Sequence, residues 1–290
     1  MKKVVILGCE NSHADMFLGY IAEGGYPDIK IVGVYSDDTA AAQKLHDTFG
    51  VKVMECFDEA VGKVDGVIVT ARHGDLHYKY AATYIAAGAA MFIDKPITIS
   101  QTEAVEFMRQ LRDAHVRVTG GSCCKYIDYI QQLKHDHQNQ VDGKTLGGFM
   151  RAPVSVDNPY GGFFFYSQHL VEMVLEVYGH YPKSVMAFEN DGKITVIFRY
   201  PDFDVTGMFV VGNFYYYASR YAENRCDGQQ VEVLGTSPCF RAEFDEFYRI
   251  LLGGEQAQSY EDFIAPVFVL NAIHRSLQSG KEETVTEYAV

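Results

Sequence analysis

The chain has 290 residues, of which 48% are hydrophobic and 22% charged, so it can bury a sizeable core and form about two domains. Its formal net charge is -13, which opposes broad contact with nucleic acid or anionic lipid, because both are bound by basic surfaces. No run of 18 apolar residues and no signal-peptide pattern occurs. We therefore expect a cytoplasmic protein that binds neither nucleic acid nor a membrane.

Strand-like and helix-like segments alternate over the first part of the chain. Short apolar runs predict strands at 4–7, 31–35, 64–70, 90–93 and 116–119. Helical spacing between them predicts helices at 39–49, 75–87 and 101–114. Thr39, Asp75 and Ser100 are the expected N-caps of these helices. This βαβ order is typical of an α/β, doubly wound parallel sheet, the Rossmann arrangement.

The pattern changes after residue 123. Helices are expected at 127–137, 167–178, 241–252 and 260–279, and strands at 148–156, 184–189, 194–200, 206–214 and 230–234. Strands that follow one another without helical crossovers predict an α+β domain with a mixed or antiparallel sheet. We therefore predict a dinucleotide-binding domain at 1–122 and a second domain, for substrate binding and oligomerisation, at 123–290.

The loop after the first strand determines whether that sheet binds a nucleotide. A dinucleotide site would read G-x-G-x-x-G, whereas residues 8–13 read GCENSH and Glu10 adds a carboxylate. Asn11 or Ser12 can still cap the next helix, whose N-terminus attracts phosphate. Gly8, Glu10, Asn11, Ser12 and His13 are therefore candidate cofactor contacts. A strand-to-helix turn without a ligand remains the alternative.

Ser36 and Asp37 follow the second strand, where an acidic side chain would bind the adenosine ribose. Asp37 would repel a 2'-phosphate, and no Lys or Arg follows closely. This favours NAD over NADP. The neighbouring Asp38 is explained equally well as a cap of the helix that begins near Thr39.

Asp94-Lys95-Pro96 ends the strand at 90–93. Open α/β sheets bind ligands at the carboxyl ends of their strands, and proline stiffens this turn. A lysine and a carboxylate held there indicate an active site.

Together with the segment VDGVIVTARHGDLH at residues 64–77, this turn resembles the Gfo/Idh/MocA family of nicotinamide-dependent oxidoreductases over nearly the whole chain. Asp94-Lys95-Pro96 is similar to the family's Glu-Lys-Pro turn, and His77 stands where the family has a histidine. The resemblance implies that the cofactor also contacts a group of residues around these two segments, namely Thr70, Ala71, Arg72, His77, Asp94, Lys95 and Pro96.

The resemblance continues into the second domain. Gly161-Gly162, followed by His169, looks like the family's glycine pair and catalytic helix. It implies that Lys95 polarises a substrate hydroxyl or carbonyl, that His169 exchanges its proton, and that hydride passes between the substrate carbon and NAD. It further implies a sugar, cyclitol or polyol substrate, and an open-faced sheet that forms a homodimer or homotetramer.

Two further residues are candidate substrate contacts. Lys125 falls where the family has a basic residue, although a solvated surface lysine is the alternative. Tyr166 belongs to an aromatic tract that could stack on a sugar ring, although such tracts more often build cores or interfaces.

Elementary acid–base chemistry favours this assignment of roles. An alcohol cannot give up hydride unless its proton also leaves, so a base must lie within hydrogen-bond reach. A histidine titrates near neutrality, whereas a free lysine stays charged and stabilises a developing oxyanion. Lys95 is therefore interpreted as an electrostatic clamp and His169 as the proton acceptor.

The sequence is also compatible with functions other than a dehydrogenase. Many relatives of this kind place an aspartate four residues before the histidine, where this chain has Phe165. Phe165 at that position, together with Glu10 and His13 in the loop, motivates the alternative that the protein is a non-catalytic sensor that binds a nucleotide or sugar. A nicotinamide-dependent elimination and a purely structural role also stay open. The spacing of His73, Asp75 and His77 resembles a metal site, but the adjacent Arg72 opposes one, and no metal is predicted.

Overall fold

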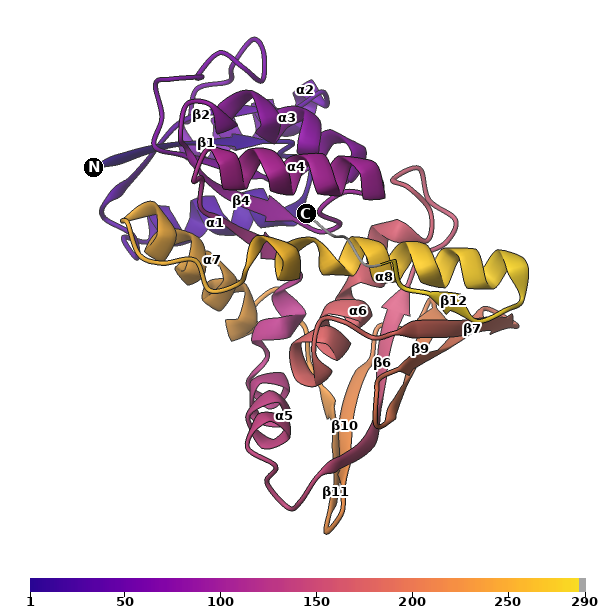
Figure 1. Cartoon of the computed structure of the whole chain (residues 1–290). Helices are drawn as coiled ribbons and strands as arrows, with labels where there is room; N and C mark the ends of the chain where they lie inside the picture. The colour runs from indigo at the N-terminus through magenta and orange to yellow at the C-terminus, as the bar shows by residue number, and fades with distance from the viewer. Residues whose placement is uncertain (287–290) are drawn as a thin grey trace. The chain divides into compact units, whose positions relative to one another are not determined.

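The structure is a computed structural model, and it describes residues 1–286 (Figure 1). The chain divides into two compact units, one made of Met1–Gly121 with Phe244–Phe263 and the other of Ser122–Glu243 with the chain from Ile264 onward. The division into domains at 122 and 123 stays a prediction. The compact units depart from it in one respect, because Phe244–Phe263 pack with the N-terminal segment.

A five-stranded parallel sheet forms the centre of the first unit, in the order β2-β1-β3-β4-β5. Its strands are β1 (Lys2–Leu7), β2 (Ile29–Tyr35), β3 (Gly66–Val69), β4 (Ala90–Asp94) and β5 (Val118–Gly121). The inner strands β3 and β4 are buried at every residue, because helices cover both faces of such a sheet. This confirms the predicted doubly wound α/β architecture.

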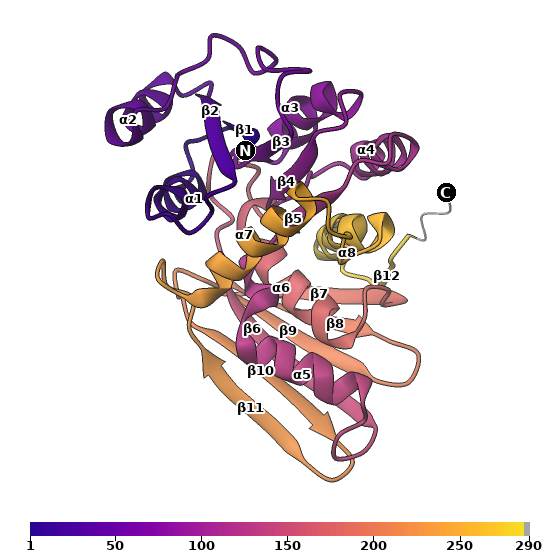
Figure 2. The same cartoon turned by 90° about the vertical axis from the view of Figure 1, so that its left-hand side faces the viewer.

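Four helices connect these strands: α1 (Ser12–Ala22), α2 (Thr39–Phe49), α3 (Asp75–Ile85) and α4 (Gln101–Asp113). Helices α1 and α2 lie on one side of the sheet, and α3 and α4 on the other (Figure 2). Ser100 caps α4 as predicted. Asp38, the alternative to Thr39, is confirmed as the cap of α2, because it accepts from the N–H groups of Ala40 and Ala41. The predicted cap Asp75 is wrong by one position, since Gly74 precedes α3.

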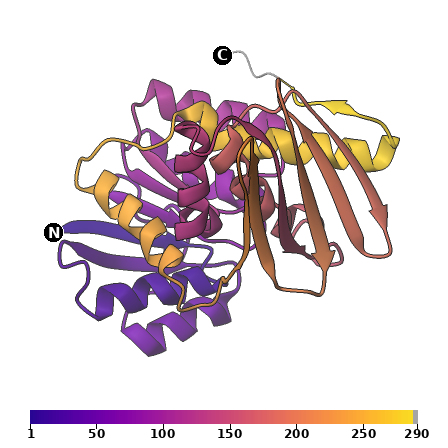
Figure 3. The same ribbon diagram turned by 90° about the horizontal axis from the view of Figure 1, so that it is seen from below.

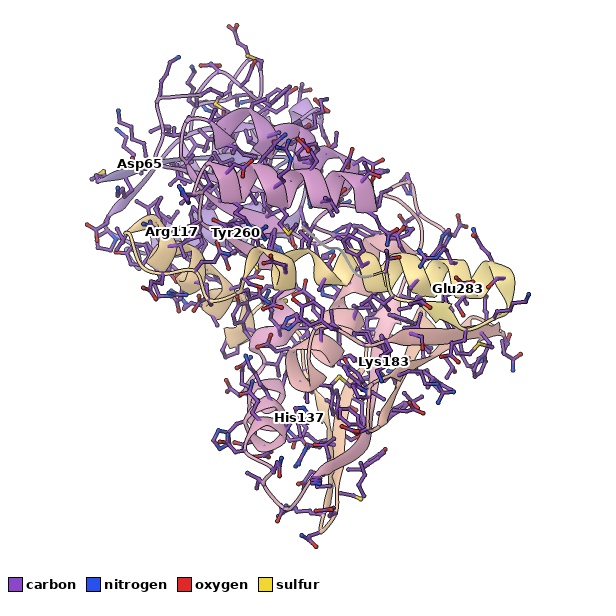
Figure 4. All side chains as sticks on the ribbon, viewed as in Figure 1. Asp65, Arg117, His137, Lys183, Tyr260 and Glu283 are labelled. Carbon is purple, nitrogen blue, oxygen red and sulfur yellow. The ribbon has the colours of Figure 1, made fainter. Side chains whose placement is uncertain are left out.

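A late segment of the chain completes the core of the first unit. From Phe244 onward, α7 (Pro238–Leu251) places its phenylalanines in the cluster that contains β1 and α1. The rings of Phe17 and Phe244 lie 4.7 Å apart between centroids, and those of Phe92 and Phe247 lie 6.3 Å apart. Two residues labelled in Figure 4 bind this segment to the backbone of the same unit, because Tyr260 donates to Val116 O and Arg117 to Ile250 O.

The second unit contains a seven-stranded mixed sheet, whose strands Figure 3 shows side by side. They are β6 (Thr145–Val154), β7 (Ser184–Asn190), β8 (Lys193–Arg199), β9 (Asp204–Val211), β10 (Tyr216–Ala222), β11 (Cys226–Val231) and β12 (Glu283–Thr284). Only β6 and β9 pair in parallel. The mixed sheet is as predicted, but β10 was not expected as a strand.

Helices cover one face of this sheet. They are α5 (Asp128–Gln138), α6 (Phe164–Tyr178) and α8 (Tyr260–Ser279), and the short 3-10 helix η1 (Cys123–Tyr126) precedes them. In β8, Ile194, Val196 and Phe198 are buried while their neighbours are only partly covered, which is the alternation of a sheet with one covered face. No helix within residues 1–286 is long and apolar enough to cross a membrane.

Candidate active site

The turn after β1 requires a glycine. Gly8 has a φ of +71°, and a Cβ placed on it would lie 2.4 Å from the Cβ of Ala71. Both conditions exclude a side chain. Thr70 at the end of β3 donates from Oγ1 to Gly8 O at 3.0 Å. The first glycine of the expected motif therefore brings β1 against β3 at the carboxyl edge of the sheet.

Glu10 spans the carboxyl edge between β2 and β3. Its carboxylate accepts one hydrogen bond from Ser36 Oγ, at 2.6 Å, and another from the backbone N–H of Arg72, at 3.0 Å. Three predicted cofactor residues are thus brought together around one carboxylate, in the part of the crevice where a dinucleotide's adenosine half would lie in this fold. An anion held here is compatible with ribose hydroxyls and opposes phosphate.

Asp37 is an exposed residue whose carboxylate oxygens accept from two tyrosines. Tyr35 donates at 2.7 Å and Tyr80 at 2.9 Å. The hydrogen bond from Tyr35, together with that from Tyr80 and the charge of Lys79, lowers the pKa of Asp37 despite its partial burial. Two of its four acceptor positions are therefore used within the protein.

Two predicted cofactor residues, Asn11 and His13, contact Asp94. Asn11 Nδ2 donates to Asp94 Oδ2 at 2.8 Å, and His13 Nδ1 lies 2.7 Å from the same oxygen. Asn11 occupies the N-cap position of α1 but its side chain makes no capping bond, while Ser12 is exposed. Burial raises the pKa of Asp94, but the charge and hydrogen bond of His13 outweigh it and bring the pKa below its ordinary value.

Asp94 in turn organises the lysine turn. Its Oδ1 accepts from the backbone N–H of Lys95 at 2.7 Å, and both residues are almost fully covered. The Lys95–Pro96 peptide bond is cis. Lys95 therefore stands at the carboxyl end of β4, as predicted, and is 5% exposed. Pro96 packs against the start of α3, since a Cβ on Gly74 would meet its Cγ at 2.7 Å.

His77 supports the end of β3 from the first turn of α3. Its Nε2 lies 2.7 Å from Ala71 O and must carry the hydrogen, because a carbonyl only accepts. Burial lowers the pKa of His77, so it is neutral at pH 7. This contact turns His77 away from His73 and Asp75, whose side chains lie 3.7 Å apart.

These residues fit a dinucleotide in part of the crevice. The Gly8 turn and the N-terminus of α1 provide the close backbone approach that a pyrophosphate needs. Glu10 uses two of its four acceptor positions within the protein. We conclude that this part of the site fits a dinucleotide.

In the second unit, α6 buries His169 against η1. His169 Nδ1 lies 2.6 Å from Ser122 Oγ and 3.5 Å from Cys124 Sγ. The rings of Tyr166 and Tyr216 flank the imidazole, with centroids 4.9 and 6.4 Å away. Because these polar contacts are made through Nδ1, Nε2 is the ring nitrogen that could serve a substrate.

Lys125 is not a solvated surface lysine. It is 4% exposed and its Nζ lies 3.1 Å from Glu172 Oε2. Burial opposes its charge, but Glu172 and other nearby acidic groups outweigh this and raise the pKa of Lys125, so its amine is charged. The other oxygen of Glu172 accepts from Ser122 N at 3.0 Å. Lys125 is thus joined through Glu172 to the residue that binds His169.

The prediction from sequence missed Ser122 and Cys124. Their signal was positional, because both follow the end of the predicted strand at 116–119, where ligand-binding side chains gather in such sheets. Phe165, which stands four residues before His169, packs on Tyr160 with ring centroids 5.1 Å apart. Lys95 belongs to the first unit and His169 to the second.

Solved structures of similar fold cover almost the whole chain. The myo-inositol dehydrogenase of Corynebacterium glutamicum ATCC 13032 superimposes with a TM-score of 0.83 at 14% identity, over 99% of this chain and 100% of that one. The scyllo-inositol dehydrogenase of Lactobacillus casei gives 0.84 at 15%, over 98% of both chains. GenD2 from gentamicin A biosynthesis, solved with NAD, gives 0.83 at 15%, over 99% and 97%. At these identities, the likeness shows the fold.

Sequence comparison places the first part of the chain more narrowly. The glucose-6-phosphate 3-dehydrogenase of Bacillus subtilis (strain 168) is 28% identical over 149 residues, which are 50% of this chain and 41% of that protein. The aligned region thus spans about two fifths of that relative. Residues 2–122 match the family model described as the oxidoreductase family, NAD-binding Rossmann fold. The resemblance to the Gfo/Idh/MocA oxidoreductase family is confirmed over residues 2–122.

Proposed function

We propose that the protein is an NAD-dependent oxidoreductase that acts on a sugar, cyclitol or related polyol. The observation that carries the proposal is Lys95, fixed by Asp94 at the carboxyl end of β4 in a domain of this family. The relatives named above, which are dehydrogenases of inositols and of glucose 6-phosphate, support a polyhydroxylated substrate. NAD, when bound, supplies the hydride acceptor.

The chain's own residues divide the remaining work. Lys95 orients the substrate oxygen and stabilises negative charge that develops on it. His169 takes the proton of the reacting hydroxyl at Nε2, and returns it in the reverse direction. Tyr166 lies beside the imidazole and offers an aromatic face to a sugar ring.

Replacement of the lysine tests this function. With NAD and a panel of inositols and sugars, Lys95→Met is expected to reduce turnover by at least about 10²-fold, because it removes a preorganised charge at the reacting oxygen. Lys79→Met is the matched control, since Lys79 is an exposed lysine of the same unit. Folding of both variants is checked by circular dichroism. Turnover of Lys95→Met at the unaltered rate would refute the assignment.

We further propose that Glu10 sets the preference for NAD over NADP. Its carboxylate lies between Ser36 and Arg72 N, where the added charge of a 2'-phosphate would be repelled. Calorimetry gives the dissociation constants of NADP and of NAD. Glu10→Gln should lower the ratio of the NADP constant to the NAD constant about tenfold or more. Asp37→Asn is the control and should change the ratio less, because Asp37 is exposed and solvent screens its charge.

The same titrations decide between the enzyme and a non-catalytic sensor. The observation that favours the sensor is that Glu10, Asn11 and His13 are all bonded within the protein. No binding of NAD, NADP or their reduced forms at millimolar concentration would support a sensor of another ligand. Binding without turnover on the polyol panel would support a nucleotide sensor.

We also propose that the partly covered face of the second sheet forms a homodimer or homotetramer. Phe188 on β7 is 49% exposed, and Met186 and Ile197 are cross-strand neighbours on the same face. An apolar sheet face of this kind is typical of interfaces. Light scattering of Phe188→Glu should show a smaller assembly than the wild type, and an unchanged mass would contradict the proposal.

A further inference from the structure

His169 lacks a carboxylate at the nitrogen that faces away from the substrate. Its Nδ1 contacts Ser122 Oγ at 2.6 Å and Cys124 Sγ at 3.5 Å. The nearby Glu172 is committed elsewhere, because it accepts from Ser122 N at 3.0 Å, pairs with Lys125 at 3.1 Å, and also accepts from Gln168. A protonated imidazole in this place needs another source of negative charge.

The need for a counter-charge follows from burial. His169 is 5% exposed, and a buried cation that has no partner is strongly disfavoured. When Nε2 holds the substrate's proton, the imidazolium carries hydrogen on Nδ1 as well. Ser122 can accept that hydrogen but stays neutral, so the charge must be balanced by a different group.

We propose that Cys124 is held as a thiolate beside His169 and provides the counter-charge for its imidazolium form. This inference rests on the proposed function of His169. Cys124 is a positioning residue, because its sulfur contacts Nδ1 and not the substrate. The pair rests as thiolate and imidazolium. When a substrate carbonyl is reduced, the Nε2–H bond breaks, the substrate oxygen gains the proton, and the thiolate keeps its charge throughout.

The surroundings of the sulfur favour the anion. Burial by itself raises the pKa of Cys124, but a hydrogen bond from Cys123, the charge of His169 and hydrogen bonds from His169 and Ser122 outweigh it and place the pKa well below its ordinary value. Cys123 is the thiol that keeps its proton, since the hydrogen bonds with Cys124 and Cys239 raise its pKa.

Titratable side chains of four elements surround the pair. On α6, Tyr166 flanks the imidazole, and Glu172 forms a salt bridge with Lys125 of η1. On β10, Tyr216 lies beside His169. Burial raises the pKa of both tyrosine hydroxyls, so they are neutral at pH 7. On α7, the charge of Glu243 acts on Cys123. Among these acidic groups, Cys124 is the one that contacts Nδ1.

Ultraviolet absorbance of the thiolate tests the proposal without cofactor or substrate. At about pH 6.5 an ordinary cysteine is about 1% ionised, so the other cysteines contribute almost no thiolate absorbance. The wild type should therefore show one thiolate per chain, that of Cys124. Cys124→Ser and His169→Gln should each lose it, and Cys226→Ser, which alters an exposed cysteine, should keep it. A wild type without thiolate at this pH would overturn the proposal. A signal that survives Cys124→Ser or His169→Gln would do the same.

A second measurement separates charge from packing. The protonation of His169 at pH 7 is read from the nitrogen NMR spectrum of the imidazole, with His169→Gln used for assignment. Cys124→Ser preserves the size of the side chain and should lower the protonated fraction about tenfold or more, whereas Cys124→Asp should restore it. Equal fractions in the wild type and in Cys124→Ser would refute the counter-charge. Because neither measurement involves NAD, failure of the proposed function would leave both results interpretable.

Discussion

Asp94→Ala is the change that tests most sharply how the loop after β1 is joined to the lysine turn. Asp94 is fully buried and accepts from Asn11 at 2.8 Å, from His13 at 2.7 Å and from Lys95 N at 2.7 Å. Its removal leaves these donors without their acceptor. Breaking a buried pair by deleting one partner costs about 3–5 kcal/mol, and we expect a loss of that size in the free energy of unfolding.

Urea unfolding followed by circular dichroism measures this loss. Glu106→Ala is the matched control, because Glu106 is a partly exposed carboxylate on α4 that pairs with Arg109, and ion pairs in contact with solvent stabilise a fold very little. Asp94→Asn should fall between the two, since the amide keeps one accepting oxygen. A loss of less than about 1 kcal/mol for Asp94→Ala would refute the idea that Asp94 holds the loop and the turn together.

The same carboxylate predicts a pH dependence. The pKa of Asp94 is lowered in the folded protein, because the charge and hydrogen bond of His13 outweigh the effect of burial. A carboxylate with a depressed pKa stabilises the fold above its unfolded value of about 3.9. This contribution is lost as the pH falls through the lower folded value. The difference in unfolding free energy between wild type and Asp94→Ala should therefore shrink below about pH 4.

Three further outcomes are expected in urea unfolding experiments. Gly8→Ala should cost about 2–4 kcal/mol, because it combines a left-handed φ with a 2.4 Å clash against Ala71; a neutral effect would contradict that close approach. Lys125→Met should cost about 3–5 kcal/mol. Adding Glu172→Leu should recover only part of this loss, because it removes the unpaired carboxylate but leaves Ser122 N and Gln168 without their acceptor. Stability should fall as the pH drops below about 6.5, because burial lowers the folded-state pKa of His77 and the unfolded chain binds the proton more readily; His77→Gln should flatten that slope.

The elements that the sequence predicted well are those specified by local pattern. The run VIVT at 67–70 is apolar at almost every position, and so is the strand before Asp94. Short apolar runs of this kind predict strands that are buried on both faces. Ser100 was correctly expected to cap α4. Strand β10 was missed because Tyr216 and Tyr217 look like part of an aromatic tract, and only their pairing with β6 and β11 makes them a strand.

The site residues were named individually, but their partners could not be. Asn11 and His13 were predicted as cofactor contacts, and the sequence did not indicate that both bind Asp94, more than 80 positions along the chain. Likewise, nothing in the local sequence around His169 indicates that Ser122, 47 positions earlier, meets its Nδ1. Hydrogen bonds between segments this distant depend on strand order and helix placement, which a single sequence does not specify.

The return of Phe244 and Phe247 to the sheet of β1 and β4 has a consequence for synthesis on the ribosome. When Gly121 emerges, every strand of the parallel sheet is available, but the aromatic rings that fill its core beside Phe17 are still untranslated. At about 5–20 residues per second, the wait lasts on the order of ten seconds. During that interval the nascent chain exposes an apolar surface. We therefore expect the first unit to complete its folding only after Phe247 has emerged, together with the second unit, and to depend on chaperones that cover this surface.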